Sequence, residues 1–388
     1  MYNLTTKDNM RTIKRISFFA LLIMAALFTG CNNGSYGPTS PYINYVGRVD
    51  KSNPNFVSFA YPGVTIQTKF RGTSITARLK DQAMLGMHNT FYCIIDNGEP
   101  QKIVLNESQY DYILASRLKD TLHTVELIKL TESFVGEVIF CGFFAGDKPS
   151  DAFLVYPDTL PSLKMEFVGN SLTCGYGNEL SSMTPKAGFS PLNENNYYAY
   201  GAITARALNA QYVCTAYSGK GVYRNYEGDS ENTIPHFYDK TIATKADSKW
   251  DINEYIPDIL VLNIGTNDFQ AESTTKIRVD SIRFIAEYTA FLQRMKGYYP
   301  DAEIICAVGP AVNDNMEFFP NQLTRYSQCV LTAIRNAGGE ENHIHYFETK
   351  PQEGPFGEDY HPTIDTHKRM ANELVSFIIE KKLIKTEK

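Results

Sequence analysis

The stretch "EFVGNSLTCGYGN", residues 166–178, begins as an apolar strand and ends among small residues. Residues 166–168 have the pattern of a buried strand, and Gly169, Asn170 and Ser171 break it. Asn and Ser at such a break suit the N-cap of a following helix, whereas an exposed serine there could also act as a nucleophile. The remaining sequence is needed to distinguish a structural turn from a catalytic one.

Length and composition describe a globular protein. The chain has 388 residues, of which 43% are hydrophobic and 21% charged, which allows two domains with their own cores. The formal net charge is -6, and no concentrated basic run is present. Because phosphate binding needs such a run, we predict no nucleic-acid partner. The sequence makes no prediction of oligomeric state.

The first 31 residues resemble an export signal. Basic residues precede a nearly unbroken apolar segment, residues 16–28, which is too short for a membrane span and typical of a signal peptide. The small residues before Cys31 resemble a bacterial lipobox, which implies lipidation of Cys31 and a membrane-anchored lipoprotein at the periplasmic face or cell surface. A cleaved signal with a stray cysteine is the alternative. Residues 32–42 are polar and indicate a linker.

Residues 43–150 follow the period of β-strands. Apolar and polar residues alternate over 64–70, 73–79 and 123–130, and a further strand pattern covers 136–144. No convincing helical period interrupts them. We therefore predict an N-terminal all-β domain, a jelly-roll-like sandwich.

The pattern changes over residues 155–388, where apolar strands alternate with helical stretches. The predicted strands are 163–169, 211–217, 258–265, 302–309 and 344–348. The predicted helices are 196–210, 278–296, 322–338 and 363–382. Such alternation favours an α/β domain with a parallel sheet of about five strands between helices, a flavodoxin-like three-layer arrangement. Ligands bind beyond the carboxyl ends of the strands in sheets of this kind.

Four polar segments follow the carboxyl ends of these predicted strands. Ser171 follows the first strand, Gly219 the second and Asn267 the third, while His361 follows the fifth. These ends meet at one edge of a parallel sheet, so we expect the four segments to converge there. Their residue types suit acyl transfer. A serine hydroxyl needs a base, for which His361 is the candidate, and main-chain or amide N–H groups would stabilise the oxyanion.

As an ordered set, "GNSLTCGYGNE", "SGKGVYRNY", "GTNDF" and "DYHP" resemble the blocks of the SGNH hydrolase superfamily and, within it, carbohydrate esterase family 2. The resemblance covers residues 45–385 and implies a β-sandwich ahead of the hydrolase domain. It implies Ser171 as nucleophile, His361 as base, and Ser171, Gly219 and Asn267 as the oxyanion hole. Position 170 is Asn where the superfamily usually has Asp.

The third catalytic member is the least defined. The Asp-x-x-His spacing of the superfamily points to Glu358, and the Asp-x-His spacing of family 2 points to Asp359. We predict Asp359 in this role, with Glu358 or a Ser-His dyad as alternatives.

The resemblance also implies the reaction. We predict a secreted serine esterase, of the acetylxylan esterase type, that removes O-acetyl groups from xylan- or glucomannan-type polysaccharides or oligosaccharides without a metal or organic cofactor. A lipase, a thioesterase, a peptidoglycan O-acetyl esterase and a non-catalytic glycan-binding lipoprotein are the alternatives. Aromatic residues beside the four blocks could pack on sugar rings or simply on neighbouring side chains; they are Tyr176, Tyr223, Phe269 and Tyr360.

Overall fold

The computed structural model describes residues 36–84, 86–146, 152–185, 188–315 and 319–384. The predicted signal peptide and Cys31 lie outside these residues. Within the described ranges, no helix has both the length and the apolar character needed to cross a membrane.

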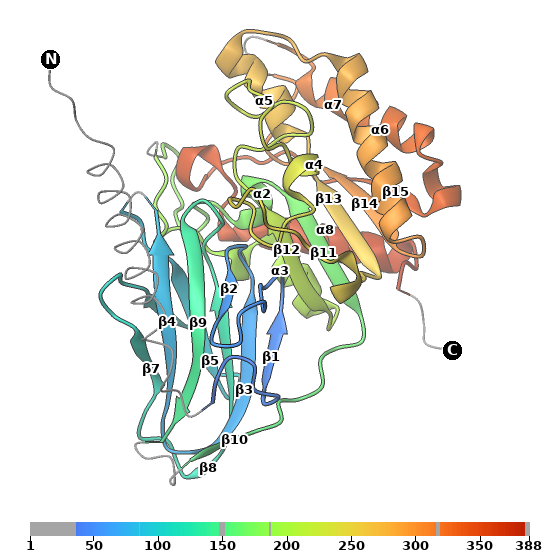
Figure 1. Cartoon of the computed structure of the whole chain (residues 1–388). Helices are drawn as coiled ribbons and strands as arrows, with labels where there is room; N and C mark the ends of the chain where they lie inside the picture. The colour runs from blue at the N-terminus through green and yellow to red at the C-terminus, as the bar shows by residue number, and fades with distance from the viewer. Residues whose placement is uncertain (1–35, 85, 147–151, 186–187, 316–318, 385–388) are drawn as a thin grey trace, which may run out of the picture.

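The N-terminal part of the chain is a β-sandwich (Figure 1). One sheet has the order β1-β3-β8-β5-β6, with β10 also paired to β3, and its strands are β1 (Ile43–Val46), β3 (Thr65–Gly72), β5 (Thr90–Ile95), β6 (Gln101–Val104), β8 (Thr121–Lys129) and β10 (Phe153–Val155). The other has the order β2-β9-β4-β7, with β2 (Val57–Phe59), β4 (Ile75–Ala83), β7 (Asp111–Ala115) and β9 (Gly136–Ala145). Phe59, Phe91 and Phe140 are fully buried in its core. The predicted all-β domain is confirmed.

The second part contains a parallel five-stranded sheet of order β12-β11-β13-β14-β15. Its strands are β11 (Lys164–Gly169), β12 (Gln211–Ala216), β13 (Ile259–Asn263), β14 (Glu303–Val308) and β15 (Ile344–Glu348). The α-helices are α2 (Ser171–Cys174), α3 (Tyr200–Ala207), α4 (Ile234–Phe237), α5 (Thr266–Thr275), α6 (Ser281–Tyr298), α7 (Gln322–Asn336) and α8 (Ile364–Glu380). Short 3-10 helices are η1 (Asn196–Tyr198), η2 (Ile252–Glu254), η3 (Gly339–Asn342) and η4 (Glu358–Tyr360).

Helices cover both faces of this sheet (Figure 1). Side chains such as Phe167 and Val261 point to the face where α3 and α8 pack, and their neighbours Val168 and Leu262 point to the face of α6 and α7. Successive strand residues alternate between faces, and both faces are covered, so the strands read as continuous apolar runs. The predicted three-layer α/β domain is confirmed.

Buried polar contacts join the two domains. Arg48, just after β1, forms an ion pair with Glu166 of β11 at 2.8 Å, and both side chains are almost fully buried. The hydroxyl of Tyr238 donates to the other oxygen of the same carboxylate at 2.9 Å. A buried charge left without its partner is strongly destabilising, so this pair holds the sandwich against the sheet.

Candidate active site

The sharp turn at the end of β11 places Ser171 at the start of α2. A Cβ on Gly169 would lie 2.0 Å from the hydroxyl of Thr173, so only glycine fits there. Asn170 is the N-cap residue, and its side-chain oxygen accepts the Leu172 N–H at 3.3 Å. The Asn170 side chain therefore supports the turn through a hydrogen bond to a main-chain N–H. An aspartate could accept the same bond, so the departure from the usual superfamily residue leaves the geometry intact.

His361 lies beside Ser171 and is held by the main chain. Its Nε2 is 2.8 Å from the Ser171 hydroxyl oxygen, and its Nδ1 is 3.0 Å from the carbonyl oxygen of Glu358. A carbonyl can only accept, so Nδ1 carries the proton and Nε2 presents its lone pair to the serine hydroxyl. This is the tautomer that a base for Ser171 requires.

The environment of His361 favours its neutral form. Partial burial lowers the pKa of the imidazole, and this effect outweighs the hydrogen bond to Glu358 and the negative charge of Asp359, which raise it. The ring of Tyr176 stacks on the imidazole with centroids 4.2 Å apart and planes 27° apart. At neutral pH the ring is therefore unprotonated and fixed in orientation.

The carboxylate of Asp359 makes a different contact from the one predicted. It accepts the Tyr176 hydroxyl at 2.6 Å and the Gly188 N–H at 3.0 Å. The Asp359 backbone is in the left-handed region, with φ at 48°. Nδ1 of His361 bonds the main-chain carbonyl of Glu358 instead of the Asp359 carboxylate. Asp359 influences His361 through its charge, through its main chain and through the Tyr176 hydroxyl that it binds.

Glu358, the other candidate acid, also bonds elsewhere. Its carboxylate accepts the side-chain amide of Asn193 at 2.6 Å and the Ser190 N–H at 3.1 Å. Among the described residues, neither acid forms a side-chain hydrogen bond to His361. The geometry is that of a Ser-His dyad oriented by a backbone carbonyl.

The predicted oxyanion donors come from the ends of three adjacent strands. Ser171 follows β11, Gly219 follows β12, and Asn267 lies in the first turn of α5 after β13. Within the described part of the chain, the N–H groups of Ser171 and Gly219 have no hydrogen-bond partner. The Asn267 amide donates one hydrogen to the Lys220 carbonyl at 2.9 Å, and its other hydrogen has no partner among the residues that the structure describes. Three donors are thus available for an oxyanion.

Asp268 fixes the loop that carries Gly219. Its fully buried carboxylate accepts the N–H groups of Val222, Tyr223 and Arg224 at 2.7, 2.9 and 2.9 Å. Burial raises the pKa of Asp268 to about 6, although the three N–H bonds oppose the shift. Sequence reasoning singled out Asn267 and missed the role of its neighbour.

A second feature that sequence reasoning missed is the run of four polar residues, 193–196. The Asn193 amide bonds Glu358, the Asn195 amide bonds the Tyr92 hydroxyl of the sandwich at 2.7 Å, and the Asn196 amide bonds two carbonyls of α2 at 3.0 Å. The segment therefore ties the nucleophile turn, the His361 loop and the sandwich together. Its only sequence signal is a dense group of amides in a short stretch.

The four aromatic residues have different surroundings. Phe269 is fully buried and packs on Phe284 and Tyr326, and Tyr223 is 7% exposed with its hydroxyl accepting the Asp280 N–H. Their predicted role in substrate binding is corrected, since neither ring is open to a sugar. Tyr176 is partly buried against His361, and Tyr360 is 60% exposed.

We expect Asp359→Asn and Glu358→Gln each to lower turnover of an aryl acetate by less than about tenfold, because the Glu358 carbonyl remains. Loss of a true triad acid costs about 10⁴-fold. Asp359→Asn also removes a charge that raises the His361 pKa, so the acid limb of kcat/KM should move to lower pH. Steady-state rates over a pH series measure both effects. A loss above a hundredfold in either folded variant would restore that acid to a triad.

The chain matches two family profiles in succession. Residues 45–152 match the carbohydrate esterase 2 N-terminal family, and residues 167–369 match the GDSL-like lipase/acylhydrolase family. The structure is similar to that of a family two carbohydrate esterase from Clostridium thermocellum in complex with cellohexaose. Its TM-score is 0.78 and its identity 33%, over 88% of this chain and 100% of that one.

Two curated relatives align over most of this chain. The cellulase/esterase CelE of Acetivibrio thermocellus is 34% identical over 88% of the chain, which spans 40% of the length of CelE. An acetylxylan esterase / glucomannan deacetylase of Cellvibrio japonicus is 27% identical over 93% of this chain and 97% of its own length. The chain therefore belongs to carbohydrate esterase family 2, with the N-terminal domain of that family followed by a GDSL-like hydrolase domain.

Proposed function

We propose that this carbohydrate esterase removes O-acetyl groups from acetylated polysaccharides or oligosaccharides of the xylan or glucomannan type. The observation that carries the proposal is the 2.8 Å contact between His361 Nε2 and the Ser171 hydroxyl, with His361 held in the basic tautomer. The names of the Cellvibrio japonicus relative and of the cellohexaose complex support a carbohydrate substrate.

The reaction follows from the placement of these groups. The Ser171 oxygen attacks the acetyl carbonyl carbon while His361 Nε2 takes the hydroxyl proton. The N–H groups of Ser171 and Gly219 and the free amide hydrogen of Asn267 bind the oxyanion that forms. His361 then returns the proton to the sugar oxygen as the carbon–oxygen bond breaks, which leaves an acetyl group on Ser171. Water, deprotonated by His361, attacks that ester, and His361 returns the proton to the Ser171 oxygen as its bond to the acyl carbon breaks and acetate is released.

The surroundings of the dyad suit a polar alcohol group better than a long acyl chain. A Cβ on Gly219 would meet no atom within 4 Å, so the surface beside this donor is open. Tyr360 is next to His361 in the chain and is 60% exposed, with the Phe356 ring centroid 5.4 Å from its own. We infer that the exposed part of this side chain contacts the sugar. We infer that selectivity comes from the sugar, since an acetyl group offers only one methyl for recognition.

We expect acetate to be the preferred acyl group. In a series of nitrophenyl esters from acetate to octanoate, kcat/KM should fall steeply with chain length. One methylene more or less changes the free energy of transition-state binding in a pocket by about 1–3 kcal/mol. Acetylated xylan and glucomannan, assayed alongside by acetate release, should both be substrates. Faster cleavage of octanoate than of acetate, with no acetate from either glycan, would instead indicate a lipid esterase.

A lipid anchor on Cys31 is a separate proposal that rests on the sequence before residue 36. A lipidated cysteine would hold the exported enzyme at a membrane, with residues 32–42 as the tether. Metabolic labelling with a fatty-acid probe should mark the wild type and leave Cys31→Ser unmarked; equal labelling of both would refute the anchor.

A further inference from the structure

The sandwich reaches the loop that carries the oxyanion donor Gly219. Glu132 lies between β8 and β9 and is fully buried. Its carboxylate accepts the Ser218 N–H at 2.7 Å and also the Ser218 hydroxyl. On the other side of Gly219, the Asn267 amide holds the Lys220 carbonyl. Both chain neighbours of Gly219 are therefore anchored, one by the sandwich and one by the hydrolase domain.

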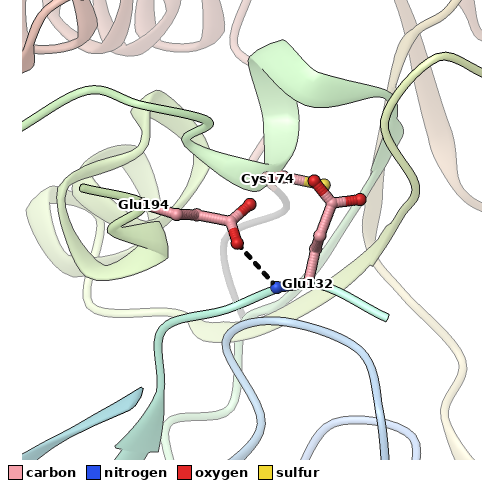
Figure 2. A group of neighbouring side chains, drawn as sticks. All are labelled: Glu132, Cys174 and Glu194. Atoms are coloured by element: carbon pink, nitrogen blue, oxygen red, sulfur yellow. Dashed lines mark hydrogen bonds between the residues drawn. The ribbon is translucent and has the colours of Figure 1, made fainter. Parts of the chain in front are cut away.

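Glu132 is itself fixed from the hydrolase domain. Its N–H donates to one carboxylate oxygen of Glu194 at 3.0 Å, as the dashed line in Figure 2 shows. Glu194 is fully buried, and its carboxyl group also interacts with the carboxyl group of Glu132. Because Glu194 belongs to the segment 193–196, the same short stretch supports both Glu132 and the loop of His361.

Burial acts on the pKa values of both glutamates in this cluster. Burial raises the pKa of Glu194 well above its usual range, and the negative charge of Glu132 raises it further. Burial also raises the pKa of Glu132, and the two bonds from Ser218 oppose that shift. The buried Lys129 amino group bonds the Glu132 and Thr131 carbonyls. Burial lowers its pKa to about 7, although the nearby carboxylates oppose the shift.

The same cluster has the residue types of a metal site but not the chemistry of one. The ligand atoms of Glu132, Cys174 and Glu194 lie within 4.8 Å of one another (Figure 2). The oxygens of Glu132 are already bonded by Ser218, and burial raises the pKa of the Cys174 thiol well above its usual range. To bind a metal, Cys174 would have to lose its proton and become a thiolate. The cluster is better explained as a polar anchor for the Ser218 turn.

We propose that Glu132 is a positioning residue that aims the Gly219 N–H at the oxyanion formed on Ser171, so that the sandwich is part of the catalytic unit. This inference rests on the proposed function. Gly219 has φ at 77° and no side chain to pack, so the direction of its N–H depends on how its neighbours are held. Small displacements of an oxyanion donor are costly, since the donor must meet a developing charge at hydrogen-bond distance.

The test compares kcat and KM of full-length variants on 4-nitrophenyl acetate. Glu132→Ala should lower kcat about tenfold or more with KM within about threefold, because the bond serves the transition state. Glu132→Gln should recover to within about threefold of the wild type, since its amide oxygen accepts the Ser218 N–H. The control Glu137→Gln removes an interdomain ion pair with Lys245 that involves neither this loop nor the segment 193–196, and it should stay within about twofold.

A second pair of variants keeps the test decisive if Glu132→Ala does not fold. Ser218→Ala retains the main-chain bond and should lower kcat about threefold. In the double variant with Glu132→Gln, the loss of transition-state stabilisation should be smaller than the sum of the two single losses, because both residues act through one contact. Full kcat in folded Glu132→Ala or in Ser218→Ala, or strict additivity, would overturn the positioning role. Absence of esterase activity in the wild type would instead count against the proposed function.

Discussion

Ser171→Ala is expected to lower the turnover of an aryl acetate by at least about 10⁴-fold while the fold is retained. Removal of the nucleophile in a serine hydrolase leaves only the catalysis that binding and the oxyanion donors provide. Among the described residues, the Ser171 hydroxyl makes one hydrogen bond, with His361 Nε2 at 2.8 Å, and its main-chain N–H is unaffected by the change. The substitution therefore removes the reacting oxygen and little else.

The control for this result is Ser181→Ala, which changes an exposed serine of the following loop. It should leave kcat and the melting temperature unchanged. Thermal unfolding of both variants separates loss of chemistry from loss of fold. Near-normal turnover in a folded Ser171→Ala would remove Ser171 from the reaction.

Asn267→Ala is expected to lower kcat by about 10²–10³-fold, the usual effect of removing one oxyanion donor. KM should change by less than about threefold, because the lost bond forms only in the transition state. The same amide holds the Lys220 carbonyl at 2.9 Å, so its loss also loosens the loop that carries Gly219. Both effects weaken the stabilisation of the same oxyanion, so both lower kcat.

A matched comparison is Asn225→Ala, which removes amide contacts to Asp229 and Glu231 and an oxygen that accepts the Gly221 N–H of the same loop. That change weakens the loop without removing an oxyanion donor, so it should cost clearly less kcat than Asn267→Ala. Equal losses in the two variants would mean that Asn267 acts through loop structure alone. A loss below threefold in Asn267→Ala would exclude it from the oxyanion hole.

The layer structure and the site location could be predicted because they depend on local patterns. Strand period and strand–helix alternation are visible in short windows, and the carboxyl ends of parallel strands fall at one edge by topology alone. Ser171 and His361 are 190 residues apart in the chain and still meet at 2.8 Å. The predicted fold class implied that the four segments lie side by side, whereas none of the four segments alone indicated this.

The orientation of His361 could not be predicted in the same way. Spacing rules point to acidic side chains, whereas the group that bonds Nδ1 is the carbonyl of Glu358, which any residue at that position would supply. The left-handed backbone at Asp359 carries its carboxylate to Tyr176 instead. A main-chain partner leaves no signature in the residue types.

Phe269 shows how a missed helix misplaces a side chain. Sequence analysis assigned no helix directly after the third strand, before residue 278, but Thr266–Thr275 forms α5. Successive helical residues turn by about 100°, so Phe269 points about 200° away from Asn267 and enters the core while Asn267 faces the site. Glu132 was missed for a different reason: its partner, Ser218, lies in another domain, and local patterns carry no information on such contacts.

The most direct test of the account is the site of covalent labelling by a fluorophosphonate probe, mapped by mass spectrometry of the digested protein. Phosphonylation needs a serine that is activated as a nucleophile. We expect one modified peptide, with the label on Ser171, and no label on that peptide in Ser171→Ala. Labelling of a different serine, or acetate release by a wild-type protein in which Ser171 stays unmodified, would contradict the assignment of Ser171 and His361 as the reacting pair.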